Sequence, residues 1–290
     1  MTTDSDEVEE PLAGGDVTEG VVRVGDTVRR PVSRASESVR RVLEHLESVE
    51  FEGAPRFHGI DVKDRDILDF IDGEVAGRPW PAWVADPEHI ASVARLVRAF
   101  DDAMEPLGVP PWANGLRQAD IPRIPDSIAG APTLIAHLDV TPENVVFRAG
   151  RAAALIDFDM IRPATRAEEV ANLLLWWGGW MPEVDRESAS RNLDPIEAGA
   201  LIVDTYGLDD AVRTTLVELS INVADRSWFL MKSRAEMFGG GWQRMWDEGV
   251  GDRTIRRAQW LRENAHDLQR AVASDVSMVN PASCRTAWPR

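Results

Sequence analysis

The sequence predicts an α+β protein, in which a small β-rich unit with one helix precedes a larger, mainly helical part. Up to residue 71, short apolar runs alternate with turn-forming residues, as is typical of strands and hairpins. Beyond that point, apolar residues recur at the three- and four-residue spacing of amphipathic helices. The 290 residues suffice for one large domain or two lobes, and a hydrophobic content of 44% suffices for a substantial core.

The first part, residues 12–71, begins with a glycine-containing turn and a β-hairpin whose own turn is Gly25-Asp26. Val39, Val42, Leu43 and Leu46 then follow helical spacing. Asp72-Gly73 ends the unit. The expected strands cover residues 21–24, 27–31, 56–60 and 66–71, and the expected helix covers residues 36–48.

The second part, residues 72–275, is expected to be a helical lobe. Asp86-Pro87 and Asp194-Pro195 each combine a polar cap with a proline at the first helical position. The region 106–131 is rich in proline and glycine and predicts a long loop. The expected helices cover residues 87–104, 168–180, 195–207, 208–238 and 254–272, and short strands are expected at 133–136 and 152–156.

The ends of the chain and its charge limit the possible partners. Residues 1–11 are acidic and residues 276–290 follow the last helix, so both are expected to be tails, the first of them disordered. The formal net charge of −17 argues against DNA or RNA as a partner, because a phosphate backbone would be repelled. The same acidity would suit a cationic substrate or simply a solvated surface.

The composition also predicts the compartment. Cys284 is the single cysteine, which excludes a disulfide framework within the chain and a cysteine-based metal site. The first residues have no apolar run of the kind found in signal peptides. The most apolar stretch, residues 170–181, is too short to span a bilayer. We therefore expect a cytoplasmic protein that has no membrane partner.

The residues that carry chemistry are concentrated between residues 137 and 159. His137, Asp139 and Asn144 have the spacing of a phosphoryl-transfer loop of the type H-x-D-x-x-x-x-N. Asp157 then ends an apolar strand, where a carboxylate needs a partner or a cation. In such sites one carboxylate orients the attacking hydroxyl, while an amide and a second carboxylate hold Mg²⁺. Asp159 is read either as a ligand of a second Mg²⁺ or as the cap of the next turn.

These motifs resemble the aminoglycoside phosphotransferase and choline-kinase-like family over residues 12–270. In that family the loop reads H-G-D-x-x-P-x-N and the metal strand reads I-D-[FW], which match residues 137–144 and 156–158 here. The resemblance implies a bilobal protein-kinase-like fold with ATP between a small β lobe and a larger helical lobe. The resemblance also implies ATP and Mg²⁺ as cofactors.

The family pattern assigns a role to each matching position. Turn residues 16–20, which include Gly20, would cover the phosphates through their backbone N–H groups, and residues 69–71 would form the hinge that meets adenine. The implied catalytic residues are Asp139 as the base and His137 as a brace of the loop. The implied metal ligands are Asn144 and Asp157, with Asp159 as a further candidate. The implied nucleotide contacts are Arg29, Gly20, Asp69 and Ile71.

Three departures from the family pattern concern the nucleotide site. Arg29 occupies the strand position that usually carries lysine, and arginine needs different room for its planar fork. Val39 takes the place of the helix glutamate that partners that lysine. Leu138 replaces glycine, and Glu143 stands where a small residue is usual. The base and the metal residues are unchanged.

The leading hypothesis is an ATP-dependent transfer of the γ-phosphoryl group to a hydroxyl of a small molecule. A cationic amino sugar or amino alcohol is one candidate acceptor, with Asp185, Glu187 and Asp204 as acidic residues that would face it. The alternative is a non-catalytic, kinase-like nucleotide-binding module, which the missing lysine and glutamate favour. A metal-dependent phosphohydrolase or glycosyltransferase that uses Asp157-Phe158-Asp159 is a weaker third reading. Oligomeric state is left open by the sequence.

Overall fold

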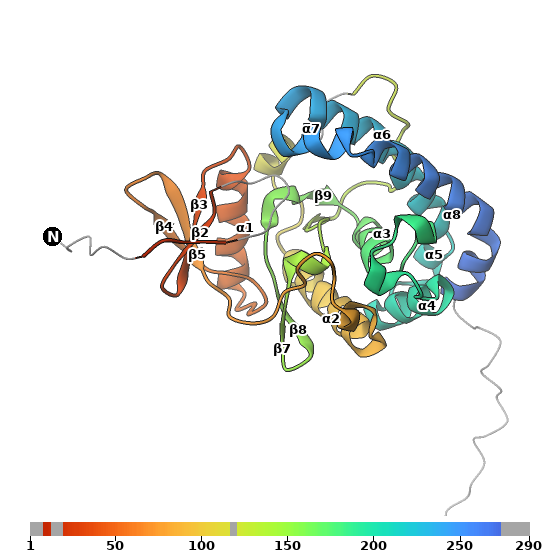
Figure 1. Cartoon of the computed structure of the whole chain (residues 1–290), viewed down its shortest axis with the longest axis horizontal. Helices are drawn as coiled ribbons and strands as arrows, with labels where there is room; N and C mark the ends of the chain where they lie inside the picture. The colour runs from red at the N-terminus through yellow and green to blue at the C-terminus, as the bar shows by residue number, and fades with distance from the viewer. Residues whose placement is uncertain (1–7, 13–19, 117–120, 274–290) are drawn as a thin grey trace, which may run out of the picture.

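The computed structural model describes residues 8–12, 20–116 and 121–273. It has a small sheet with one helix at one end and a larger, mainly helical part at the other (Figure 1). The predicted α+β class and the order of the two parts are therefore confirmed. Among the described helices, none is both long enough and apolar enough to cross a membrane.

The N-terminal sheet is antiparallel, with the strand order β1-β2-β3-β5-β4. Its strands are β1 (Glu10–Pro11), β2 (Val22–Val24), β3 (Thr27–Pro31), β4 (Phe57–Ile60) and β5 (Arg65–Asp69). The predicted hairpin is the β2–β3 pair. Glu10 and Pro11, which the sequence places in the acidic tail, form β1 and pair with Arg23 and Val22. The remainder of that tail, residues 1–7, lies outside the described residues.

One helix, α1 (Ser36–Ser48), packs on this sheet and has the predicted bounds. Val39, Val42, Leu43 and Leu46 form its buried face. On the same helix, the Arg40 guanidinium pairs with the nearly buried Asp66 of β5, with N–O distances of 2.7 and 2.6 Å. Apolar burial and this ion pair together fix the helix on the sheet that leads to the site.

The chain crosses to the second part through residues 70–73. The Phe70 N–H donates to the Asp26 carbonyl in the β2–β3 turn. Glu74 then pairs through both of its backbone groups with Phe147, at N–O distances of 2.9 and 2.7 Å. The connection is thus anchored at one end on the small sheet and at the other on the strand that follows the candidate catalytic loop.

Helices form most of the second part. They are α2 (Pro87–Met104), α3 (Arg166–Trp176), α4 (Pro195–Tyr206), α5 (Asp210–Arg213), α6 (Leu216–Phe238), α7 (Gly240–Asp247) and α8 (Val250–Val272). Asp86 and Asp194 cap α2 and α4 as expected. The single helix expected over 208–238 is interrupted between α5 and α6. There the Thr214 and Thr215 hydroxyls donate to carbonyls three residues back, a local bond that competes with the helix.

Two antiparallel strand pairs lie between these helices. β6 (Leu134–Ala136) pairs with β9 (Arg162–Ala164), and β7 (Val145–Arg148) pairs with β8 (Arg151–Leu155). The sequence predicted β6 and β8 but not β7 and β9. The β7–β8 hairpin connects the segment that contains Asn144 to the segment that contains Asp157.

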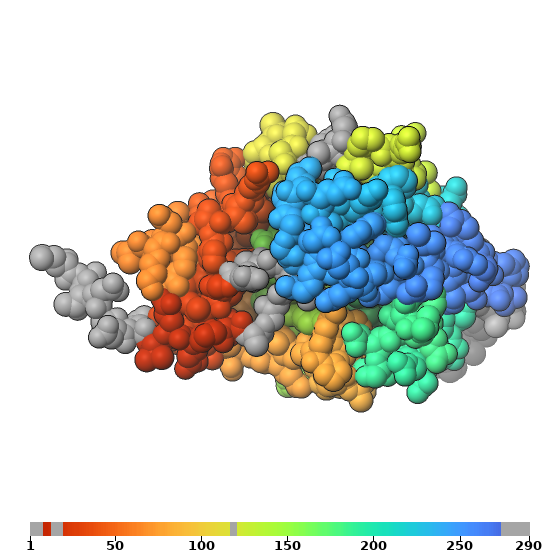
Figure 2. Space-filling view, turned by 45° about the horizontal axis from the view of Figure 1, so that its top comes forward, coloured from red at the N-terminus to blue at the C-terminus, as the bar shows by residue number. Residues whose placement is uncertain are grey.

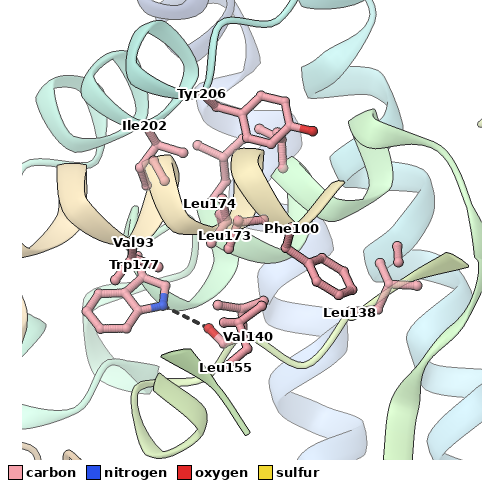
Figure 3. Close-up of a cluster of buried hydrophobic side chains, with 14 of the residues drawn as sticks. Val93, Phe100, Leu138, Val140, Leu155, Leu173, Leu174, Trp177, Ile202 and Tyr206 are labelled. Carbon is pink, nitrogen blue, oxygen red and sulfur yellow. Dashed lines mark hydrogen bonds between the residues drawn. The ribbon is translucent and has the colours of Figure 1, made fainter. Parts of the chain in front are cut away.

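Buried side chains of α2, α3 and α4 form the core of the helical part, against which the candidate site packs. Phe100 of α2, Leu174 of α3, and Ile202 and Tyr206 of α4 are at most 1% exposed and lie close together (Figure 3). Trp177 and Trp180 are equally buried and belong to the same core.

Candidate active site

Helix α3 holds the backbone of residues 137–140, the first half of the candidate catalytic loop. The carboxylate of Glu169 accepts hydrogen bonds from the backbone N–H groups of His137, at 2.6 Å, and Leu138, at 3.0 Å. Glu169 is fully buried, and burial together with the charge of Asp101 raises its pKa well above the usual range. A buried carboxylate costs free energy unless it is hydrogen-bonded, and here the loop supplies the bonds.

Asn172 and Trp177 also bind the backbone of Leu138 and Val140. Asn172 accepts from the Val140 N–H at 2.9 Å and donates to the Leu138 carbonyl at 3.1 Å. The indole N–H of Trp177, at the end of α3, donates to the Val140 carbonyl at 2.8 Å (Figure 3). The loop is therefore fixed by side chains of one helix rather than by its own turn.

Leu138 explains why the related motif carries glycine at this position. Its φ is +58°, a left-handed conformation that glycine adopts freely and other residues adopt at a cost of about 1–2 kcal/mol. The side chain is 7% exposed and packs in the core (Figure 3). Burial of this leucine offsets the backbone cost, so the departure from glycine leaves the loop conformation intact.

His137 is a structural member of the site. It is fully buried, and its Nε2 lies 3.1 Å from the Ile156 carbonyl at the end of the β7–β8 hairpin. Its ring packs edge-on against Phe158, with the centroids 4.8 Å apart. Burial lowers the pKa of His137 to about 4, so the imidazole is neutral near pH 7. These contacts join the catalytic loop to the metal strand.

Asp139 and Asn144 are brought together at the two ends of the loop. The Asn144 amide donates to the Asp139 carboxylate at 3.0 Å and to its carbonyl at 2.9 Å. Burial, and next the charge of Asp157, raises the pKa of Asp139 to about 7, against the opposing effect of Arg234. A carboxylate with this pKa is suited to exchange a proton at neutral pH.

The second carboxylate group of the site follows strand β8. Asp157 has a φ of +60° and caps a short helical turn by accepting from the Asp159 N–H at 3.4 Å. Asp157 and Asp159 both receive hydrogen bonds from Arg30 of β3, at 2.9 and 2.5 Å. Burial opposes the charge of Arg30, but these two carboxylates outweigh it and raise its pKa.

The structure does not bring Arg29 to this cluster. Its side chain donates to the Thr27 hydroxyl and lies 3.9 Å from Asp61. Arg29 and Arg30 are neighbours on one strand, so their side chains leave opposite faces of the sheet. Pairing with β5 sets Arg30 opposite Asp66 and turns it toward Asp157. Arg30 therefore occupies the position that the sequence assigned to Arg29.

The expected nucleotide contacts are only partly described. Gly20 precedes β2 with a φ of +81°, whereas residues 16–19 of the same turn lie outside the described residues. The Asp69 N–H donates to the Arg56 carbonyl at 3.0 Å, and its carboxylate pairs with His58. Asp69 is thus engaged in the sheet, and Ile71 lies in the connection itself.

The structure shows what Val39 and Glu143, two of the departures from the family pattern, contact. Val39 is 7% exposed and contributes to the apolar face of α1, where the related pattern has glutamate. Glu143 accepts from the Trp80 indole at 2.9 Å and pairs with Arg78. Its carboxylate therefore ties the catalytic loop to the segment that leads into α2.

The oxygen donors around Asp157 fit a hard cation. Mg²⁺ prefers carboxylate and amide oxygens, and Asn144, Asp157 and Asp159 supply them. The Arg30 guanidinium already lies between the two carboxylates, which indicates that they attract a cation. Within the described ranges no group of three or more His, Cys, Asp or Glu side chains could hold a metal ion, so the expected set depends on the Asn144 amide.

Sequence reasoning missed three residues that build this site. Glu169 lies in the first turn of α3, where a negative charge is favourable in any case, and its neighbour Glu168 forms the capping box with Thr165. Asn172 is a polar residue inside the apolar stretch 170–181, and its polarity there is the signal that could have identified it. The role expected for Arg29 falls on Arg30 in the structure. The two arginines are neighbours in sequence, and no sequence signal distinguishes which of them faces Asp157.

Comparison with known proteins identifies the family and the fold that this chain resembles. Residues 56–199 match the model of the phosphotransferase enzyme family. An ethanolamine kinase of Plasmodium vivax superposes with a TM-score of 0.61 at 14% identity, covering 90% of this chain and 84% of that chain. The fold and the family match support a small-molecule phosphotransferase. The resemblance to the aminoglycoside phosphotransferase and choline-kinase-like family is thereby confirmed.

Two further relatives extend the comparison. A choline/ethanolamine kinase family protein of Mesorhizobium loti superposes with a TM-score of 0.58 at 14% identity, covering 93% of this chain and 94% of that chain. The trifolitoxin immunity protein of Rhizobium leguminosarum bv. trifolii is 28% identical over 272 residues, which are 90% of this chain and 98% of the relative. The structural likeness establishes the protein-kinase-like fold, and the sequence likeness spans nearly the whole relative.

Proposed function

We propose that this protein is an ATP-dependent phosphotransferase that moves the γ-phosphoryl group to a hydroxyl of a small molecule. The observation that carries the proposal is the position of Asp139. Asn144 holds its carboxylate at 3.0 Å, and Asp157 lies close enough to contribute to its raised pKa of about 7. A base beside a cation-binding carboxylate is the arrangement that phosphoryl transfer to a hydroxyl requires.

Asp139 acts as the general base. Its carboxylate accepts the proton of the acceptor hydroxyl as the oxygen attacks the γ-phosphorus, and the bond between that phosphorus and the bridging oxygen of ADP breaks. The Asn144 amide keeps the carboxylate oriented. Braces from Glu169, Asn172 and Trp177 prevent the loop from reorganising during the reaction, which is the main protein contribution when catalysis consists of positioning.

Arg30 takes the place of the usual lysine in binding the nucleotide phosphates. Its guanidinium is nearly buried at the face of β3 turned toward Asp157. Gly20, which precedes β2, covers the phosphates, and the connection at Ile71 meets adenine. Asn144, Asp157 and Asp159 would hold Mg²⁺, which supplies charge neutralisation on the triphosphate.

The proposal is tested by ADP release in a library screen of sugars, amino sugars, amino alcohols and hydroxy acids. A turnover signal that depends on the acceptor and is lost in Asp139→Asn supports the enzyme. Binding of Mg·ATP without turnover for any acceptor supports instead the nucleotide-binding module. Release of phosphate from other phosphoesters without ATP would favour a phosphohydrolase.

A role in immunity is a second candidate at the level of the cell. The similarity to the trifolitoxin immunity protein covers 98% of that protein, which favours a shared role more than a shared fold alone does. Expression of this chain in a trifolitoxin-sensitive strain tests it. Growth in the presence of the toxin with the wild type but not with Asp139→Asn would join immunity to phosphoryl transfer; equal protection by both would indicate protection by binding.

A further inference from the structure

Two arginines of the helical part, Arg162 and Arg234, lie near enough to Asp139 for their charges to interact with its carboxyl group. Arg162 begins β9 and pairs across the strands with Ala136, the residue that immediately precedes His137. Arg234 lies on the last part of α6, and its guanidinium stacks over the ring of Trp242 in α7, 4.6 Å from the centroid. Helices α6 and α7, in light blue, lie on the side of the helical part that is turned toward the N-terminal part (Figure 2).

The charges of these two arginines are poorly compensated. Both side chains are half-buried, and within the described part of the chain neither makes an ion pair or a side-chain hydrogen bond. Burial, and next the charge of Arg162, lowers the pKa of Arg234 to about 10, while Asp139 acts in the opposite direction. Burial likewise lowers the pKa of Arg162. Both remain cationic at neutral pH and repel each other.

The carboxylates near Arg162 are engaged elsewhere. Glu169 accepts from the backbone of the catalytic loop, and Glu168 completes the capping box with Thr165. Asp139 is required for the acceptor hydroxyl. A third arginine, Arg226, adds positive charge near Arg162 and donates to the Pro125 carbonyl. These carboxylates act on Arg162 only through their charge, and among the described residues none forms an ion pair with Arg162 or Arg234.

The acidic residues expected to attract a cationic acceptor are also occupied. Asp185 pairs with Arg256, and Asp204 pairs with Arg213. Glu187 lies 4.0 Å from Arg78, which also pairs with Glu143. Each of these carboxylates thus has a cation within the protein, and none is left unpaired beside Asp139.

We infer that the phosphoryl acceptor carries an anionic group, a carboxylate or a phosphate, which binds between Arg162 and Arg234 while its hydroxyl meets Asp139. The inference rests on the proposed function, since it names the acceptor class of the same site. Guanidinium groups bind such anions through paired, charge-assisted hydrogen bonds. A bound anion would neutralise the two guanidinium groups, and so would remove the repulsion between Arg162 and Arg234 that is present without ligand. The same chemistry could instead serve the γ-phosphate of ATP, and the test must separate the two sources.

The first measurement is calorimetric titration of inorganic phosphate into the protein saturated with Mg·AMP-PNP, which occupies the nucleotide site. Wild type is expected to bind phosphate, and Arg162→Gln and Arg234→Gln are expected to bind it about ten-fold or more weakly. Arg95→Gln, an exposed arginine of α2 that removes the same charge, is the control and should match wild type. The affinity for Mg·AMP-PNP should change less than about two-fold in all variants.

Two results of this titration would overturn the inference. Phosphate binding that is absent in wild type, or unchanged in both variants, would show that the arginines hold no separate anion. A loss of Mg·AMP-PNP affinity comparable to the loss of phosphate affinity would assign them to the γ-phosphate. Thermal unfolding of each variant confirms that it is folded before it is scored.

The second measurement uses transfer. A bacterial small-molecule extract is separated into anion-exchange-bound, cation-exchange-bound and unbound fractions, and each is incubated with γ-³²P-labelled ATP and the enzyme. Asp139-dependent labelling should come from the anion-exchange fraction and should fall in Arg162→Gln and Arg234→Gln. Labelling confined to the cation-exchange or unbound fraction contradicts the anionic acceptor. Absence of Asp139-dependent labelling in every fraction contradicts the proposed enzyme instead, and the calorimetry alone then decides the anion site.

Discussion

Arg30 donates to Asp157 at 2.9 Å, and this ion pair joins the N-terminal sheet directly to the candidate metal strand. In the related pattern a helix glutamate would be the partner of the basic residue on β3, but Val39 occupies that place on α1. Arg30 is instead paired with Asp157 and Asp159, the expected metal ligands. A cation and a nucleotide that enter the cleft must compete with, or rearrange, this contact.

The exchange of roles between the two neighbouring arginines gives the first prediction. Arg30→Ala should weaken Mg·ATP binding about ten-fold or more, because a charge-assisted hydrogen bond is worth roughly 1.5–3 kcal/mol. Adenosine, which has no phosphate, should bind to the variant nearly as well as to wild type. Arg29→Ala is the matched control and should leave Mg·ATP affinity close to wild type, as measured by calorimetry. A larger loss in Arg29→Ala would show that the nucleotide approaches the other face of β3.

Asp157 should determine how strongly ATP binding depends on Mg²⁺. Asp157→Ala removes a charged oxygen ligand, so the affinity for Mg·ATP should fall while the affinity for metal-free ATP falls less. The same change also frees Arg30 from one of its two carboxylates. Titration of Mg²⁺ at fixed ATP measures the effect. Equal Mg²⁺ dependence in the variant and the wild type would remove Asp157 from the set of metal ligands.

Replacement of Asp139 should separate binding from catalysis. Asparagine keeps the shape of the side chain but cannot accept the proton of the acceptor hydroxyl. Loss of a general base typically lowers the rate by about 10²–10⁴-fold, while the Kd for Mg·ATP should change little. The comparison of kcat with nucleotide affinity, once an acceptor is found, tests it. A variant that keeps more than about a third of the wild-type kcat would show that Asp139 is not the base.

Glu169 should be more important for stability than its neighbour. Glu169→Ala leaves two buried backbone N–H groups without their acceptor, at about 1–3 kcal/mol each. Glu168→Ala is the control, since it removes only one side of a capping box, worth about 1 kcal/mol. Urea unfolding at pH 7 measures both free energies of unfolding. Similar losses in the two variants would mean that water or a rearranged loop replaces the Glu169 contacts.

A buried carboxyl group outside the site should make stability depend on pH. Burial raises the pKa of Asp101 to about 7, against the opposing hydrogen bond from the Tyr206 hydroxyl. The folded state then holds a proton that the unfolded state releases above about pH 4, so stability falls as pH rises from about 4 to about 7. The slope for one such group approaches about 1.4 kcal/mol per pH unit.

Asp101→Asn removes this titration while its side-chain oxygen can still accept from Tyr206. The free energy of unfolding of the variant should therefore vary less between pH 5 and pH 7 than that of wild type, in urea titrations at each pH. Asp102→Asn, the exposed neighbour on α2, is the control. An unchanged pH dependence in Asp101→Asn would assign the titration to another buried group, of which Glu169 is the nearest candidate.

The parts of this site that depend on local spacing were predictable from the sequence. His137, Asp139 and Asn144 share one short loop, and the apolar strand before Asp157 required a return of the chain beside them. The helix over Ser36–Ser48 was predicted to the residue because its apolar spacing was regular. In each case the information lay within a few consecutive residues.

What could not be predicted depends on contacts between distant segments. The face of β3 that carries Arg30 is fixed by its register with β5, and both faces of that strand carry an arginine. Glu168 and Glu169 are adjacent on the helix, but a rotation of about 100° per residue directs only Glu169 at the catalytic loop. The sequence contains both carboxylates in equivalent settings, and only the packing of α3 against β6 distinguishes them.

The hydrogen bonds from α3 to residues 137–140 also constrain how the length of this chain can change during evolution. Glu169, Asn172 and Trp177 together bond to backbone groups of His137, Leu138 and Val140, so an inserted residue within that segment would misalign the later contacts. The β7–β8 turn at Ala149-Gly150 has both residues exposed and at positive φ, and it carries no such matching. Insertions and deletions in homologous chains should accumulate at this turn and be absent from residues 137–140.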